Sequence, residues 1–273
     1  MHGLSLHKTN IMNIRNILSA ILLALVFTSC SINEEIDLST PGKGQYLIHT
    51  DMSQAMEMMK SMGGSQVPDS IKDRAIDTTF SLANEIDSLG VTLTPEQSAY
   101  YNNGTMHMVM NMPENKFNVE MKYPVKDIRD LHKFFEVYYY VDSIKSERKK
   151  EKEAAGEGAD AGPVPGAGGL DNMSKMFGGI PSKGSPYIIT DSSIQRIALT
   201  KETFTENMGE EMKGVEMFMS QMVMTITIKL PRPVKETKGE MIKVLDDKKT
   251  VVFSSSFAEM KDDPSKTEFY IKF

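Results

Sequence analysis

Large apolar residues recur at every second position in two neighbouring segments of the chain, 106–112 and 117–123. Methionine takes every second position of the first segment, and large apolar residues take every second position of the other. A period of two places alternate side chains on opposite faces of a β-strand. Because Pro113-Glu114-Asn115 lies between the segments, the pattern predicts a β-hairpin with one buried face.

Alternation with a period of two and apolar residues at helical spacing both recur along the rest of the chain. Alternation predicts further strands at 45–49, 187–190, 194–200, 222–230, 241–245, 250–255 and 267–273. Apolar residues at helical spacing predict helices at 52–62, 70–89, 95–101, 128–141, 173–177, 208–222 and 257–260. Short strands joined as hairpins favour an antiparallel sheet. We therefore predict an α+β fold, with a sheet of several hairpins and helices packed on one face.

Two segments carry no periodic pattern. Residues 30–43 are mostly polar and end near Pro41, Gly42 and Gly44, which predicts a tether. Residues 144–169 begin as a charged run and continue as a Gly- and Ala-rich run, which predicts a flexible insertion. The expected organisation is a signal peptide at 1–29, a tether at 30–43 and a single α+β domain at 44–273 with an insertion at 144–169.

The N-terminal region has the pattern of a secretory signal. Arg15 precedes an apolar run of 11 residues, 17–27, and the small residues Thr28 and Ser29 follow. A helix that spans a bilayer needs roughly 17–25 apolar residues, so we do not expect this run to remain as an anchor helix. Translation starts at Met1 or at Met12, and the sequence does not decide between them.

Residues 27–30, Phe-Thr-Ser-Cys, resemble the lipobox of bacterial lipoproteins, in which the cysteine becomes the lipidated first residue. Cys30 is the only cysteine. The residue after it is Ser31, not the Asp that retains lipoproteins in the inner membrane, and Glu34-Glu35 resembles the export signal of Bacteroidetes lipoproteins displayed on the outer surface. We expect an outer-membrane lipoprotein, facing the periplasm or the exterior, whose partner through a palmitate-type acyl anchor at Cys30 is membrane lipid.

Composition excludes several functional classes. Hydrophobic residues make up 40% and charged residues 25%, which is typical of a globular chain and not of a polytopic membrane protein. The formal charge of −6 argues against nucleic acid as a partner. One cysteine cannot build a disulfide framework or a cysteine-based zinc site. No G-x-S-x-G, H-E-x-x-H, P-loop or EF-hand motif is present, so we expect no enzyme, no catalytic residue, no metal and no cofactor.

The chain contains 22 methionines, and three interpretations of them stay open. They are adaptable core residues, or they line a pocket for an apolar ligand, or their soft thioethers handle Cu(I). The pocket candidates are Met106, Met108, Met110, Met112, Met222 and Met224. The favoured hypothesis is a binding module, with an apolar ligand. The alternatives are a structural lipoprotein without a pocket, which supports unidentified envelope protein partners, and, least favoured, a copper-handling protein.

One family resemblance covers about half of the mature chain: its main motifs lie in the C-terminal third, and the opening strand that ends in Asp51-x-Ser53 and the segment 187–200 fit the same layout. The segment 226–235, Gly239 and the segment 247–253 are similar to LppM-like bacterial lipoproteins. In that family a strand ending in Leu-Pro-Gly-x-Val precedes a hairpin with a Thr-Val-x-aromatic strand, and here Arg232 takes the place of the usual Gly. The resemblance implies a lipid-tethered α+β domain outside the cytoplasm, and it carries over no catalytic residue.

Overall fold

The computed structural model describes residues 31–54, 57, 73–154, 186–198, 200–202 and 222–273. The strands are β1 (Ser31–Asp37), β2 (Gly44–Asp51), β3 (Ala75–Ser81), β4 (Thr105–Asn111), β5 (Lys116–Val125), β6 (Tyr187–Thr190), β7 (Ser193–Arg196), β8 (Val223–Lys229), β9 (Glu236–Lys238), β10 (Ile242–Val244), β11 (Thr250–Ser256) and β12 (Phe269–Lys272). The helices are α3 (Leu82–Leu89), α4 (Pro95–Tyr101), α5 (Ile128–Ala154) and α9 (Phe257–Asp262), with a 3-10 helix, η3, at Pro264–Thr267. The predicted α+β fold is confirmed.

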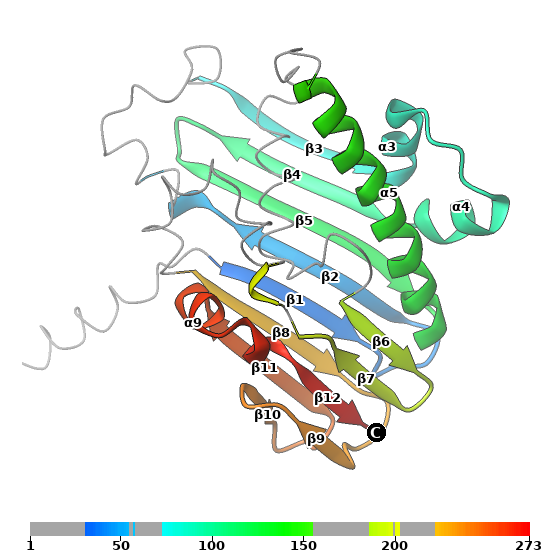
Figure 1. Cartoon of the computed structure of the whole chain (residues 1–273), viewed down its shortest axis with the longest axis vertical. Coiled ribbons are helices and arrows are strands. Elements are labelled where there is room, and N and C mark those ends of the chain that lie inside the picture. The colour runs from blue at the N-terminus through cyan, green and yellow to red at the C-terminus, as the bar shows by residue number, and fades with distance from the viewer. Residues whose placement is uncertain (1–30, 55–56, 58–72, 155–185, 199, 203–221) are drawn as a thin grey trace, which may run out of the picture.

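The strands form one sheet of eight and one of four (Figure 1). The large sheet has the order β10-β11-β8-β1-β2-β5-β4-β3, and the small sheet has the order β6-β7-β12-β9. Within the described strands, β1 and β8 form the one parallel pair, and all other neighbours are antiparallel. The antiparallel-rich sheet that the hairpin patterns predicted is therefore present.

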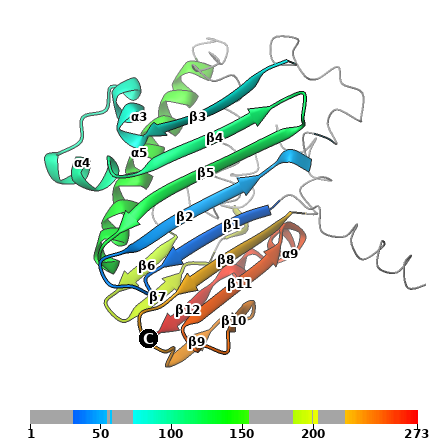
Figure 2. The ribbon, with the colours of Figure 1, turned by 180° about the vertical axis from the view of Figure 1, so that it is seen from behind.

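Helix α5 and the small sheet lie on the same face of the large sheet (Figure 1). Seen from behind, the other face of the large sheet has no described helix or strand over it (Figure 2). Phe135 on α5 connects the layers, because its ring centroid lies 4.9 Å from that of Tyr46 on β2 and 5.5 Å from that of Tyr187 on β6. On the same helix, Phe134 stacks at 4.0 Å on Tyr123 of β5. The main hydrophobic core thus lies between the large sheet and the layer that α5 and the small sheet form.

The tether predicted for 30–43 is wrong at residues 31–37, because they form β1. This strand lies between β8 and β2 in the middle of the large sheet. Ile32 and Ile36 are buried on its core face, with exposed fractions of 1% and 0%. The alternation was hard to recognise in the sequence because Glu34, a charged residue, occupies the buried position between them.

Two other segments also differ from the prediction. The helix predicted at 70–89 begins only at Leu82, and 75–81 forms β3, where the β-branched residues Ile76, Thr78 and Thr79 favour a strand. The insertion predicted at 144–169 is wrong for 144–154, since α5 continues to Ala154 through the charged run. Charged residues are good helix formers when they face solvent.

Several predicted elements lie outside the described residues. These are the remainder of the insertion, 155–169, the helix at 173–177 and nearly all of the helices at 52–62 and 208–222. A capping box begins α4: the Thr94 side chain accepts a hydrogen bond from the Gln97 N–H, and the Gln97 side chain accepts one from the Thr94 N–H.

The methionine row on β4 gives a test of the buried face. Met108 and Met110 are 3% and 6% exposed. Replacing both with Leu should cost less than about 1.5 kcal/mol of unfolding free energy per site, because volume is nearly conserved. Replacing both with Asp should prevent folding, because unpaired charges cannot be buried cheaply. Urea denaturation checks both results, and an Asp pair with unchanged stability would place the row on the surface.

Candidate functional site

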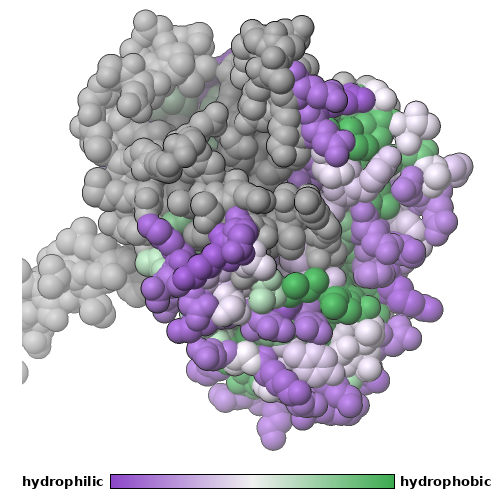
Figure 3. Space-filling model, in the orientation of Figure 1, coloured by the Kyte–Doolittle hydropathy of each residue, from purple (hydrophilic) through white to green (hydrophobic). Residues whose placement is uncertain are grey.

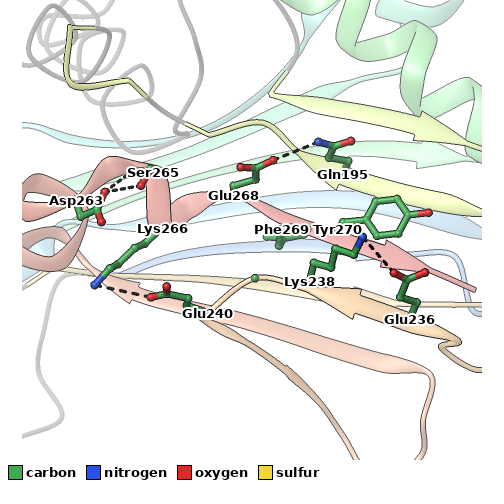
Figure 4. A pocket seen from close by; sticks show the side chains of 11 residues that line it. Gln195, Glu236, Lys238, Glu240, Asp263, Ser265, Lys266, Glu268, Phe269 and Tyr270 are labelled. Atoms are coloured by element: carbon green, nitrogen blue, oxygen red, sulfur yellow. Dashed lines mark hydrogen bonds and ion pairs between the residues drawn. The ribbon is translucent and has the colours of Figure 1, made fainter.

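A cavity of about 560 Å³ opens on the small sheet (Figure 4). Its walls come from β7, β9, β12 and η3, together with the residues that follow β9. The side chains that can contact a ligand are mostly polar or charged, and the surface on this side of the small sheet is mainly hydrophilic (Figure 3). Its volume lies in the range of small-molecule sites, about 300–1,000 Å³.

Both lysines of this cavity are paired with glutamates. Lys238 Nζ lies 3.3 Å from Glu236 Oε1, and Lys266 Nζ lies 3.8 Å from Glu240 Oε2. Across the cavity, Gln195 Nε2 donates a hydrogen bond of 3.4 Å to Glu268 Oε1. Exposed pairs of this kind add little to stability. Their consequence here is that neither lysine presents an isolated positive charge to a ligand.

Two residues shape the floor and wall of the cavity. Tyr270 on β12 is half-buried, with Lys238 Nζ 5.9 Å from its ring centroid. Gly239 has φ +132°, and a Cβ there would lie 2.9 Å from Phe269 Cβ, so this position requires glycine.

At the start of η3, hydrogen bonds from the Ser265 hydroxyl and N–H lower the pKa of Asp263, with the hydroxyl contributing most. This wall of the cavity therefore carries a fixed carboxylate.

A second, smaller cavity of about 180 Å³ lies where the β1–β2 loop, the start of α5 and the chain end meet. Apolar side chains form much of its lining, among them Leu38, Pro41, Val125, Ile128, Pro231 and Phe273. At its rim Arg129 donates hydrogen bonds to both Asp127 carboxylate oxygens, at 2.9 and 3.1 Å. These bonds hold the pKa of Asp127 below its usual range. Too small for most ligands, this cavity has room for a single side chain.

A network of polar side chains is buried in the core between the two sheets. Tyr187 on β6 donates a hydrogen bond of 2.7 Å to Glu34 on β1, and Arg196 on β7 donates one of 3.1 Å to the Thr267 carbonyl. Glu34 and Arg196 are 2% and 0% exposed. The guanidinium also lies 5.6 Å from the ring centroid of Phe253 on β11. These hydrogen bonds join the two sheets. Because solvent does not reach the groups, they do not form a ligand site.

The charge state of this network is set by burial. Desolvation raises the pKa of Glu34, against the opposing effects of the Tyr187 hydrogen bond and the Arg196 charge. Burial also raises the pKa of Tyr187, and the neighbouring Glu34 carboxylate raises it further. Nε and Nη2 of Arg196 have no hydrogen-bond partner among the described residues. A buried guanidinium with donors left over depends on the nearby carboxylate for charge compensation.

The methionines predicted to line a pocket all lie on the core side of the large sheet or at its end. Met108, Met110, Met222 and Met224 are buried, whereas Met106 and Met112 are half-buried. Neither cavity described above includes any of them in its lining. Met222 and Met224 belong to the main hydrophobic core. The pocket hypothesis for the whole set stays a prediction.

Two histidines lie close to carboxylates on the large sheet. His107 Nε2 lies 2.8 Å from Asp77 Oδ1, and His49 Nδ1 lies 4.0 Å from Glu120 Oε2, on the uncovered face of the large sheet.

In the part of the chain that the structure describes, no three His, Cys, Asp or Glu side chains gather where they could hold a metal ion. None of the helices within these ranges has the length and apolar character needed to cross a membrane. Cys30 lies just outside the described residues.

Sequence reasoning missed the groups that define both the cavity and the core network. Glu34 was interpreted as half of an acidic export signal, although the spacing Ile32-x-Glu34-x-Ile36 would have placed it on a buried strand face. The cavity residues come from three separated segments, 195, 236–240 and 263–270, so no local spacing could have indicated them. Tyr270 alone had a usable signal, since it alternates with Phe269 and Ile271 on a short strand.

Comparison with known proteins adds no relative: no protein-family model matches the chain, and no curated protein or solved structure matches it significantly.

The raised pKa of Glu34 gives a prediction on pH and stability. The folded protein binds this proton more tightly than the unfolded chain, whose pKa is near the ordinary value of 4.5. The stabilisation by protonated Glu34 is therefore complete below about pH 4.5 and is lost as pH rises towards the folded-state pKa. Relative to Glu34→Gln, the wild type should lose unfolding free energy over that range in urea titrations.

Glu35→Gln is the matched control, because Glu35 lies beside Glu34 on the opposite face and pairs with Lys229 at 2.9 Å. Because the Glu35→Gln variant keeps Glu34, its unfolding free energy relative to Glu34→Gln should fall over the same pH range as that of the wild type. A wild-type protein that gains stability over Glu34→Gln as pH rises above 4.5 would contradict the prediction.

Proposed function

We propose that this protein is a non-catalytic binding module held at the outer membrane by a lipid on Cys30, facing the periplasm or the exterior. The signal-like residues 15–29 and the position of the only cysteine support the anchor. The cavity of about 560 Å³ on the small sheet supports the binding role, and it is the single observation that carries it.

The lining of that cavity favours a polar ligand over the apolar one that the methionines suggested. Its lysines are each paired with a glutamate, so a strongly charged ligand would have to break existing pairs. Besides these pairs, the lining offers the Tyr270 ring, the side-chain carbonyl of Gln195 and several carboxylate oxygens, and these oxygens accept hydrogen bonds. A neutral ligand rich in hydroxyl groups, such as a short oligosaccharide, fits this combination of an aromatic body and acceptors.

The alternative is a structural lipoprotein that binds no ligand and supports envelope partners. The burial of Met108, Met110, Met222 and Met224 favours this alternative over an apolar-ligand carrier, because these side chains fill space in the structure. Membership of the LppM-like lipoproteins stays part of the proposal and rests on the sequence resemblance alone.

Replacement of Cys30 tests the anchor. Cys30→Ala should move the protein from the membrane fraction to the soluble periplasmic fraction, since the residue that receives the lipid is gone. Ser29→Ala keeps a small residue before the cysteine, and as a control it should stay in the membrane fraction. Fractionation without detergent and mass spectrometry of the N-terminal peptide measure both. A Cys30→Ala protein that stays with the membrane would refute the anchor.

Replacement of Tyr270 tests the cavity. Maltotriose, cellotriose and chitotriose serve as probes in isothermal titration calorimetry, and we expect at least one to bind. Tyr270→Ala should weaken that binding about tenfold, or about 1.4 kcal/mol, because the ring surface is lost. Tyr270→Phe should retain most of it. Lys272→Ala, exposed on the same strand but outside the lining, is the control. If no probe binds while all variants keep the wild-type melting temperature, the structural alternative replaces the binding role.

A further inference from the structure

The connection between the proposed anchor and the folded domain is unusually short. Ser31, the residue after Cys30, already pairs with Asp51 on β2 and with Val223 on β8. It is therefore held on both sides within the interior of the large sheet. A tether of flexible residues, which would let a domain move freely above the bilayer, is absent between Cys30 and this strand.

This connection limits how far the sheet can lie from the membrane. One extended residue spans at most about 3.3–3.6 Å, and the lipid chains would be attached to Cys30 itself. The Ser31 end of the sheet must then lie at the level of the lipid headgroups. In addition, β1 is fixed by ladders on both sides along all of its residues, so the strand cannot separate from the sheet to lengthen the connection.

The strand register assigns the surfaces at the two ends of the sheet. Asp51, Val223 and Ser256 lie at the Ser31 end, and the β4–β5 turn at 112–115 lies beyond it. At the other end Asp37 pairs with Gln45 and Lys229, and the β10–β11 turn at 246–249 lies beyond Thr250. At about 3.3 Å per residue, the six steps along β1 separate the two ends by about 20 Å.

We infer that the large sheet stands on the bilayer with its Ser31 end against the headgroup layer. The β10–β11 turn, the β1–β2 loop and the small apolar cavity beside Phe273 then face away from the membrane. This inference rests on the lipid anchor at Cys30 proposed above. The surface it assigns binds lipid headgroups, and the opposite end is the one presented to other molecules of the envelope.

Among the described residues, no cluster of one charge holds the sheet in this position. The described side chains near the Ser31 end carry both signs, with Asp51 and Glu114 beside Lys116 and Arg74. Attraction to anionic lipid needs a cluster of basic residues. Orientation therefore depends on the covalent connection, and lengthening that connection should abolish it.

The experiment uses the full-length lipidated protein reconstituted into phosphatidylcholine vesicles that contain a rhodamine-labelled acceptor lipid. Since lipidation blocks the only native cysteine, a single introduced cysteine can be labelled with a donor dye. Glu114→Cys places the dye on the β4–β5 turn, and Asp246→Cys places it on the β10–β11 turn; both positions are exposed. Energy transfer to the acceptor lipid should be clearly larger from position 114 than from position 246.

The matched control lengthens the connection in both labelled proteins. About ten flexible Gly and Ser residues, beginning with Ser, are inserted directly after Cys30, and such a chain spans roughly 17 Å on average. The difference between the two positions should then largely vanish. Equal transfer from the two positions without the insertion, or larger transfer from position 246, would overturn the inference.

Failure of the anchor itself gives a different result. Without lipid on Cys30, the protein would not sediment with the vesicles, neither position would show transfer, and the wild-type protein would take up one dye at Cys30. That outcome would refute the proposed function, whereas equal transfer in a sedimenting protein would refute only the orientation.

Discussion

The structure depends on the pairing of β1 with strands on both sides. Its antiparallel ladder with β2 connects it to β5, β4 and β3, and its parallel ladder with β8 connects it to β11 and β10. Without β1, the eight-stranded sheet would divide into two smaller sheets whose edges carry unpaired backbone groups. The position of the core and of the small sheet over it follows from this one strand.

The same strand carries the most costly residue of the core. Glu34 lies between Ile32 and Ile36 on the buried face, and the Tyr187 hydroxyl and the Arg196 charge compensate it from the small sheet. Isolated buried charges are very unfavourable, whereas a compensated pair requires its partners to be in one arrangement. The network thus ties the small sheet to the large one at a defined place. Apolar contacts alone, such as Phe253 of β11 against Phe269 of β12, would permit one sheet to slide on the other.

Sequence patterns predicted those parts of the fold in which one face is buried and the other is wet. The β4–β5 hairpin, β8, β11 and the start of α5 all have regular periods, and they lie where expected. The patterns failed where a residue type opposes its environment: Glu34 hid β1, and the polar Asp77 and Thr79 on the wet face concealed β3 within an apparent helix. The cavity on the small sheet could not be predicted, because Gln195, Lys238 and Tyr270 meet only through long-range pairing.

The parallel pairing of β1 with β8 also has a consequence for how the chain folds. Ser31–Asp37 comes near the start of the described chain, whereas Val223–Lys229 comes near its end, so the central ladder joins two of the most distant segments. Contacts of such high sequence separation form slowly, because a long loop must be closed before they contribute. During synthesis β1 keeps one edge open until β8 has been made. Completion of the large sheet is thus a late event in folding.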